Sequence, residues 1–178
     1  MDSDILYCSR FYAEPRFRYQ DQELYWLQQP ANLAAMAHSK IFSKKDIKIT
    51  MDFLNSIRKR IQGGRVLDLC GGISRYGKVL ESLFDEIDIF DLKPSFGDIE
   101  PGKQGRLMRG NLINLSPFAL WANYDCIFAN WALCYLGFQE LLELLSSLYS
   151  MLKPNGSLIL KEPILSDGET TPRLCRSG

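Results

Sequence analysis

Residues 65–75 read Arg-Val-Leu-Asp-Leu-Cys-Gly-Gly-Ile-Ser-Arg. The first five are mostly aliphatic and predict a buried strand, and the two adjacent glycines then permit a tight turn. A helical pattern of apolar residues follows over 75–84. Open α/β sheets bind nucleotides at a glycine-containing turn between the first strand and the first helix. The same residues also fit an ordinary strand-to-helix connection.

Four more aliphatic runs follow this turn and alternate with helical or loop segments. Such alternation predicts right-handed βαβ units and a parallel sheet. The second helix ends at Lys153-Pro154-Asn155-Gly156, a turn that leads into the last strand. We therefore expect an α/β fold, a Rossmann-like parallel sheet flanked by helices. The expected strands are 65–69, 86–92, 106–112, 124–130 and 157–162, and the expected helices are 75–84 and 138–152.

The N-terminal part of the chain is rich in aromatic side chains, among them Tyr25 and Trp26. Over 46–62 apolar residues recur every three or four positions, and Gly63-Gly64 follows as a stop signal, which predicts an amphipathic helix. We expect residues 1–62 to form an aromatic-rich segment and a cap helix that packs on the core. Residues 63–178 would then form the Rossmann-like domain.

Charge and composition exclude several classes of function. The 178 residues carry 21 basic and 21 acidic side chains, so no net field attracts the protein to nucleic acid or to an anionic membrane. No signal peptide or membrane-spanning run is present, and a cytoplasmic or nuclear location is expected. Five cysteines without a C-x-x-C pair, and a single histidine, indicate neither a disulfide framework nor a metal site.

Asp91 is the second part of the expected nucleotide site. It ends the second strand about 20 residues after the glycine turn, the spacing at which a carboxylate accepts hydrogen bonds from ribose hydroxyls. The turn lacks the G-x-G-x-x-G pattern that brings a pyrophosphate to a helix N-terminus. A nicotinamide cofactor is therefore disfavoured, and S-adenosylmethionine, which has no pyrophosphate, fits better.

Asp68 to Arg75, Asp91 and the turn before the fifth strand resemble the S-adenosylmethionine-dependent methyltransferases of the Rossmann-like class. More narrowly, the chain from Tyr25-Trp26 to about Lys161 resembles the alpha N-terminal protein methyltransferases. The Tyr-Trp pair, Gly72-Ile73-x-Arg75 and Asn130-Trp131 carry this resemblance. It implies strand order 3-2-1-4-5, S-adenosylmethionine as the cofactor, and methyl transfer to a protein amine, with an N-terminal α-amino group as the narrower expectation.

The resemblance also implies roles for individual residues. The matching arginine meets the methionyl carboxylate, and Tyr25, Trp26 and Trp131 would contact the peptide substrate. Tyr135 and Glu162 are the candidates for assisting proton removal. The expected cofactor-binding residues are Cys70, Gly71, Gly72, Arg75, Asp91, Leu92, Leu112 and Asn130.

The chain departs from the family pattern at several of these positions. Cys70 and Ser74 stand where the family has glycines, Tyr135 where it has a histidine, and Pro163 where it has an asparagine. A neutral tyrosine, with an unperturbed pKa of about 10, is a poor base for an α-amino group whose pKa is near 8. A non-catalytic, methyltransferase-like binding or scaffold subunit is therefore the alternative function.

The segment after the fifth strand is shorter than the family leads one to expect. Some sixteen polar residues remain, too few for the C-terminal helix and strand pair, so that strand pair is expected to be missing. The fifth strand would then form an open edge, and open edges invite pairing with another chain. A partner chain on this edge is a further expectation.

Overall fold

The computed structural model describes residues 19–30, 32, 40–115, 123–133 and 136–162. Within them lies one five-stranded parallel sheet of order β3-β2-β1-β4-β5. The fold class and strand order expected from the sequence are confirmed. The strands are β1 (Arg65–Leu69), β2 (Glu86–Asp91), β3 (Gln104–Arg109), β4 (Tyr124–Asn130) and β5 (Leu152–Lys161).

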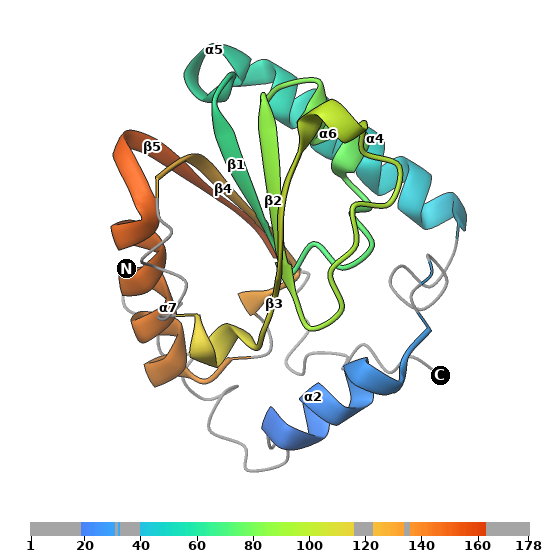
Figure 1. Ribbon diagram of the computed structural model, residues 1–178, viewed down its shortest axis with the longest axis vertical. Helices are drawn as coiled ribbons and strands as arrows, with labels where there is room; N and C mark the ends of the chain where they lie inside the picture. Colours follow the sequence, from blue (N-terminus) through green and yellow to red (C-terminus); the bar gives the residue numbers. More distant parts are fainter. Residues whose placement is uncertain (1–18, 31, 33–39, 116–122, 134–135, 163–178) are drawn as a thin grey trace, which may run out of the picture.

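Helices cover both faces of the sheet, and one lies beyond its carboxyl edge (Figure 1). α4 (Lys40–Ser56), α5 (Arg58–Ile61) and α6 (Gly77–Glu81) lie on one side, and α7 (Phe138–Met151) on the other. α2 (Tyr19–Gln28) crosses below the ends of the strands, and short 3₁₀ turns occupy Pro101–Lys103 and Leu112–Asn114. No helix in the described ranges is long and apolar enough to cross a membrane.

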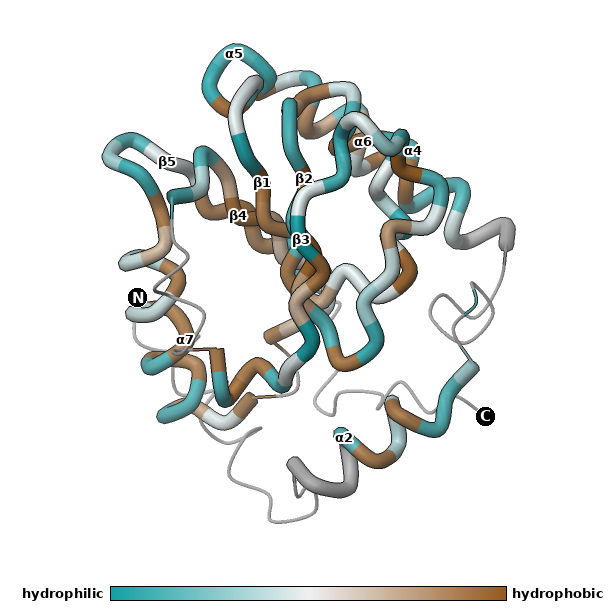
Figure 2. Tube along the Cα trace, in the orientation of Figure 1, coloured by the Kyte–Doolittle hydropathy of each residue, from teal (hydrophilic) through white to brown (hydrophobic). Residues whose placement is uncertain are grey.

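Apolar side chains fill both layers between helices and sheet, and the most hydrophobic stretches of the chain coincide with the central strands (Figure 2). On the α7 side, Leu144 and Leu148 pack against Leu67 and Ile127. On the other side, a second cluster joins residues of α4 and α6 to the opposite face of the strands, and it includes Leu54, Val66, Leu80, Ile87 and Phe128. Burial on both faces explains why the central strands β1 and β4 are predominantly apolar.

Several element boundaries differ from the expected ones. α6 is confined to Gly77–Glu81, because the glycine turn continues through Tyr76. The cap helix begins before residue 46 and breaks at Ile57 into α4 and α5. β5 begins at Leu152 rather than Ser157, and its pairing with β4 shifts register across the Lys153-Pro154-Asn155-Gly156 segment. The expected turn is thus an irregular excursion within a longer strand.

β5 is the last strand of the described sheet and pairs with β4. α5 contacts β5, and Leu160 remains 42% exposed. A partner chain on this edge stays a prediction.

Candidate functional site

The connection from β1 to α6 is a tight turn with alternating left-handed residues. Cys70, Gly72 and Ser74 have φ angles of 58°, 55° and 57°. Side chains disfavour this conformation, and a non-glycine residue held there costs about 1–3 kcal/mol. The two positions where glycine was missing from the family pattern are therefore ones at which the backbone itself calls for glycine. The turn still forms, with Ser74 N donating to Gly71 O at 2.8 Å.

Asp91 at the end of β2 is bound into this turn. Its Oδ2 accepts from Gly72 N at 3.1 Å, and its Oδ1 accepts from Lys93 N at 2.8 Å. Burial raises the pKa of Asp91 above its ordinary value, and the backbone hydrogen bonds oppose this rise. The spacing of Asp91 from the glycine turn therefore has a direct structural basis.

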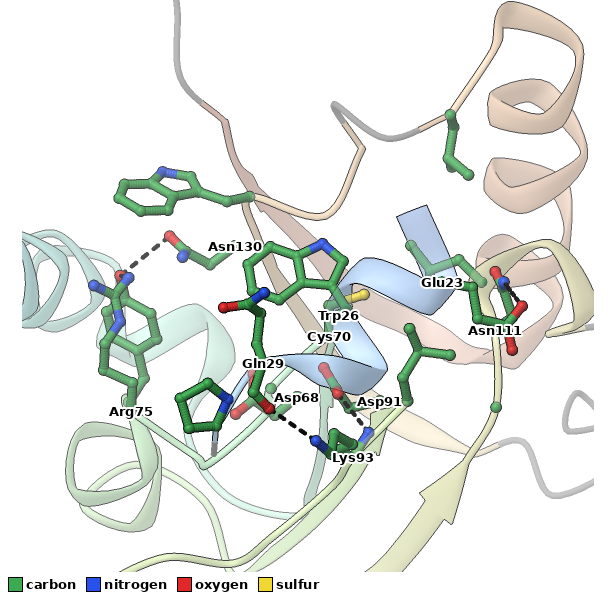
Figure 3. A pocket seen from close by; sticks show the side chains of 18 residues that line it. Glu23, Trp26, Gln29, Asp68, Cys70, Arg75, Asp91, Lys93, Asn111 and Asn130 are labelled. Atoms are coloured by element: carbon green, nitrogen blue, oxygen red, sulfur yellow. Dashed lines mark hydrogen bonds between the residues drawn. The ribbon is translucent and has the colours of Figure 1, made fainter. Parts of the chain in front are cut away.

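A pocket opens at the carboxyl ends of the strands between this turn, the end of β4 and α2 (Figure 3). Nine of the residues expected to bind cofactor or substrate line it together: Trp26, Cys70, Gly71, Arg75, Asp91, Leu92, Leu112, Asn130 and Trp131. They come from five separate segments of the chain. Sequence spacing alone related only two of these segments, the glycine turn and the end of β2 with Asp91.

Two buried ionisable side chains, a carboxyl group and a guanidinium, line this pocket, and each has an atom with no hydrogen-bond partner among the described residues. These atoms are Asp68 Oδ2 and Arg75 Nη1. Burial, reinforced by the negative charge of Asp91, raises the pKa of Asp68 to about 8, while Arg75 opposes the rise. Unsatisfied buried polar atoms are costly. They indicate a site shaped for a ligand that supplies both a donor and an acceptor.

The Arg75 side chain lies between two aromatic rings. Its guanidinium carbon is 4.6 Å from the centre of the Tyr76 ring and 5.1 Å from that of Trp131. Arg75 Nη2 also donates to Tyr76 Oη at 2.5 Å and pairs with Asp46 at 3.0 Å. The guanidinium is thus held in one orientation by stacking and hydrogen bonding.

α2 closes the pocket on its outer side through two contacts. Lys93 Nζ donates to the carbonyls of Leu27 and Gln29, at 2.7 and 2.8 Å, where the helix ends. Asn111 Nδ2 donates to Glu23 Oε2 at 2.9 Å (Figure 3). The three side chains that make these bonds, Lys93, Asn111 and Glu23, were not predicted from the sequence. The Tyr-Trp pair, which carries part of the resemblance to the family, did point to this helix. No motif marks the residues whose hydrogen bonds hold it in place.

Three other expected site residues, all within the described ranges, do not line the pocket. Gly72 acts through its backbone on Asp91, and Tyr25 packs edge-to-face on Trp26 with ring centres 5.3 Å apart. Glu162 Oε1 accepts from Ala132 N and Leu133 N, both at 2.9 Å, so it holds the backbone after β4. Tyr135 lies outside the described residues, and its role stays a prediction.

Comparison with known proteins identifies the family. Residues 14–172 match the family model described as AdoMet dependent proline di-methyltransferase. Alpha N-terminal protein methyltransferase 1 of Drosophila melanogaster is 28% identical over 85% of this chain. The human N-terminal Xaa-Pro-Lys N-methyltransferase 1 is also 28% identical, over 84%. The chain spans 58% of the length of the fly relative and 72% of the human one.

Solved structures share the fold. A SAM-dependent methyltransferase from Leishmania major superposes with a TM-score of 0.71 at 20% identity, covering 85% of this chain and 63% of that one. Phosphoethanolamine N-methyltransferase 1 of Haemonchus contortus, at 19% identity, gives 0.61 over 88% of this chain and 35% of its own. The family match covers most of the sequence and includes the glycine turn, Asp91 and Arg75, which meet in the pocket. The chain therefore belongs to the AdoMet dependent proline di-methyltransferase family.

Proposed function

We propose that this protein binds S-adenosylmethionine in the pocket and transfers its methyl group to an amine at the N-terminus of a protein. The observation that carries the proposal is a pair of buried ionisable groups, the Asp68 carboxyl and the Arg75 guanidinium, each with an unsatisfied atom. The amino-acid end of the cofactor carries an ammonium and a carboxylate. It can therefore donate to Asp68 and accept from Arg75.

Other residues of the pocket fit the remaining parts of the cofactor. Asp91 is fixed by two backbone donors at the carboxyl end of β2, where a carboxylate reaches ribose hydroxyls. Leu92 and Leu112 supply apolar surface to the pocket. Cys70 takes the place of a glycine at the pocket wall, and its side chain narrows the room left there.

The reaction itself asks for orientation and for removal of one proton. S-adenosylmethionine supplies a methyl group on a positively charged sulfur, which leaves as a neutral thioether when the amine nitrogen forms its new bond. Trp26 and Trp131 line the pocket and would bind the acceptor beside the cofactor. Glu162 holds the turn that carries Trp131, whose φ of 55° is also left-handed. We propose that it acts by positioning this turn.

The acceptor is inferred from the relatives. Curated relatives are named as methyltransferases of N-terminal Xaa-Pro-Lys sequences. We propose the same class of acceptor here. It is a polypeptide whose first residue carries a free α-amino group and is followed by proline and lysine.

Calorimetric titration with S-adenosylhomocysteine tests the cofactor site. The parent chain should bind it, and Asp91→Ala should weaken binding about tenfold or more, because a charge-assisted hydrogen bond to the ribose is lost. Asp52→Ala, which removes an exposed carboxylate of α4, is the matched control and should leave the affinity unchanged. No binding to the parent would instead favour the scaffold function, for which the strained turn at Cys70 and Ser74 is the supporting observation.

Methyl transfer to a synthetic Xaa-Pro-Lys peptide, followed by mass spectrometry, tests the activity. We expect slow transfer near neutral pH and a rate about tenfold higher or more for Tyr135→His, because an imidazole accepts the amine proton far better than a neutral phenol. Tyr135→Phe separates loss of the hydroxyl from gain of the imidazole. A brisk parental rate that Tyr135→His leaves unchanged would contradict this account of proton removal.

A further inference from the structure

Next to Arg75 lies a cluster of charged and polar side chains from three distant parts of the chain. α4 contributes Asp46 and Thr50, the glycine turn contributes Tyr76, and the end of β5 contributes Lys161. Lys161 Nζ donates to Asp46 Oδ1, to Thr50 Oγ1 at 2.7 Å and to Tyr76 Oη at 3.3 Å. No motif of the sequence singled out Asp46 or Lys161.

Asp46 stands between two cations. One carboxylate oxygen accepts from Lys161, and the other pairs with Arg75 at 3.0 Å and accepts from Tyr76 Oη. The side chains of Asp46 and Arg75 are only 10% and 6% exposed. Although burial alone would raise the pKa of Asp46, its bonds to Lys161 and Tyr76 and the charges of Lys161 and Arg75 hold it below the ordinary value. The carboxylate is therefore ionised at neutral pH.

The net charge of this cluster sets the electrostatic potential at the adjoining side of the pocket. Arg75 and Lys161 carry two positive charges and Asp46 one negative charge, so the sum is positive. Without Lys161, Asp46 would neutralise Arg75 and the sum would be zero. Because these groups are little exposed, solvent screens their interactions weakly.

The orientation of Arg75 does not rest on Asp46 alone. Tyr76 and Trp131 stack on its guanidinium, and Tyr76 Oη accepts its hydrogen bond. Asp46 adds a direct ion pair and a negative charge beside the guanidinium.

We propose that Lys161 is a positioning residue for cofactor binding: it neutralises Asp46 and so leaves the charge of Arg75 available to the carboxylate of the bound cofactor. The inference rests on the proposed function, since it takes the cofactor's carboxylate to lie at Arg75. Lys161 itself touches Asp46, Thr50 and Tyr76 and does not line the pocket.

Two ligands separate this role from a structural one. S-adenosylhomocysteine carries the carboxylate, whereas 5′-deoxy-5′-methylthioadenosine has the same adenosine and a thioether but no amino-acid group. Calorimetry on Lys161→Met should show about tenfold or greater loss of affinity for the first ligand and little change for the second. Adding Asp46→Asn to Lys161→Met removes the uncompensated anion and should restore most of the lost affinity.

Lys153→Met is the matched control, because Lys153 lies on the same strand and also pairs with an aspartate, Asp125, at 2.7 Å. It should leave both affinities unchanged. Lys161→Arg keeps the charge and should retain parental binding. If Lys161→Met does not fold, the single variant Asp46→Asn tests the proposal. Its affinity for S-adenosylhomocysteine should equal or exceed that of the parent.

The proposal would be overturned if Lys161→Met lowered the affinity for both ligands equally. It would also be overturned if the double variant bound S-adenosylhomocysteine as weakly as Lys161→Met does. Asp46→Asn would likewise overturn it if it bound S-adenosylhomocysteine more weakly than the parent while its affinity for the shorter ligand stayed the same. A parent chain that binds neither ligand would contradict the proposed function itself. The two failures are therefore distinguishable.

Discussion

Asp68→Asn is expected to make the ligand-free protein more stable at pH 8, by about 3 kcal/mol or more, and to abolish most of its affinity for S-adenosylmethionine. Asp68 is buried at the end of β1, and its pKa is raised to about 8. Asparagine has nearly the same shape and carries no charge. The substitution removes a group that costs stability and that the proposed cofactor needs.

The sign of this effect on the free energy of unfolding follows from the protonation state of Asp68 in the folded and the unfolded protein. Between pH 4 and 8 the folded protein keeps the Asp68 proton, whereas the unfolded chain, with a pKa near 3.8, has released it. Asp68 therefore lowers the free energy of unfolding by about 1.4 kcal/mol for each pH unit of rise in this window. Urea unfolding at pH 5, 6.5 and 8 should show this slope in the parent and a smaller one in Asp68→Asn.

Cofactor binding should have the opposite pH dependence. A cationic ligand favours ionised Asp68, so binding below pH 8 should release a proton and affinity should rise with pH. Calorimetry in two buffers of different ionisation enthalpy measures that proton, which should disappear in Asp68→Asn.

Asp125→Asn is the control, and its effect on the free energy of unfolding should have the opposite sign. Although burial alone would raise the pKa of Asp125, bonds to Lys153 and Arg65 N lower it. Loss of the Asp125 carboxylate should therefore destabilise the protein at pH 8. An Asp68→Asn protein that is less stable than the parent at pH 8 would contradict the account of Asp68.

Gly71→Ala is expected to destabilise the protein by about 2 kcal/mol or more and to remove cofactor binding, because the new methyl group has no room. A Cβ at this position would lie 2.5 Å from Asp68 Oδ2 and 3.0 Å from Ile89 Cγ2, and both side chains are buried. Asp68 or the turn would have to move. Thermal unfolding and titration with S-adenosylhomocysteine measure the two effects.

Ser74→Gly provides the opposing control in the same turn. Ser74 has a φ of 57°, and its buried hydroxyl has no hydrogen-bond partner within the described ranges, so glycine should relieve strain and raise the free energy of unfolding by about 1 kcal/mol. If Gly71→Ala is as stable as the parent, the turn is looser than its contacts indicate.

Much of the fold could be predicted because the local patterns are strong. The bounds expected for β1 and β4 match the structure, since both are short, mostly apolar runs in the centre of a sheet that is covered on both faces. The extent of β5 could not be predicted, because pairing with β4 draws a Pro-Asn-Gly segment into the strand. The short α6 likewise reflects the three left-handed residues before it, which no helical periodicity reveals.

The sequence by itself determined the parallel sheet, the turn after β1 and the place of Asp91, because each depends on residues close in the chain or on a regular spacing. Only the tertiary structure decided which charges meet. Lys161 and Asp46 are 115 positions apart, and Lys93 reaches carbonyls 64 and 66 positions away. Such contacts arise where separate elements pack against one another. Their energetics depend on burial, which no local pattern records.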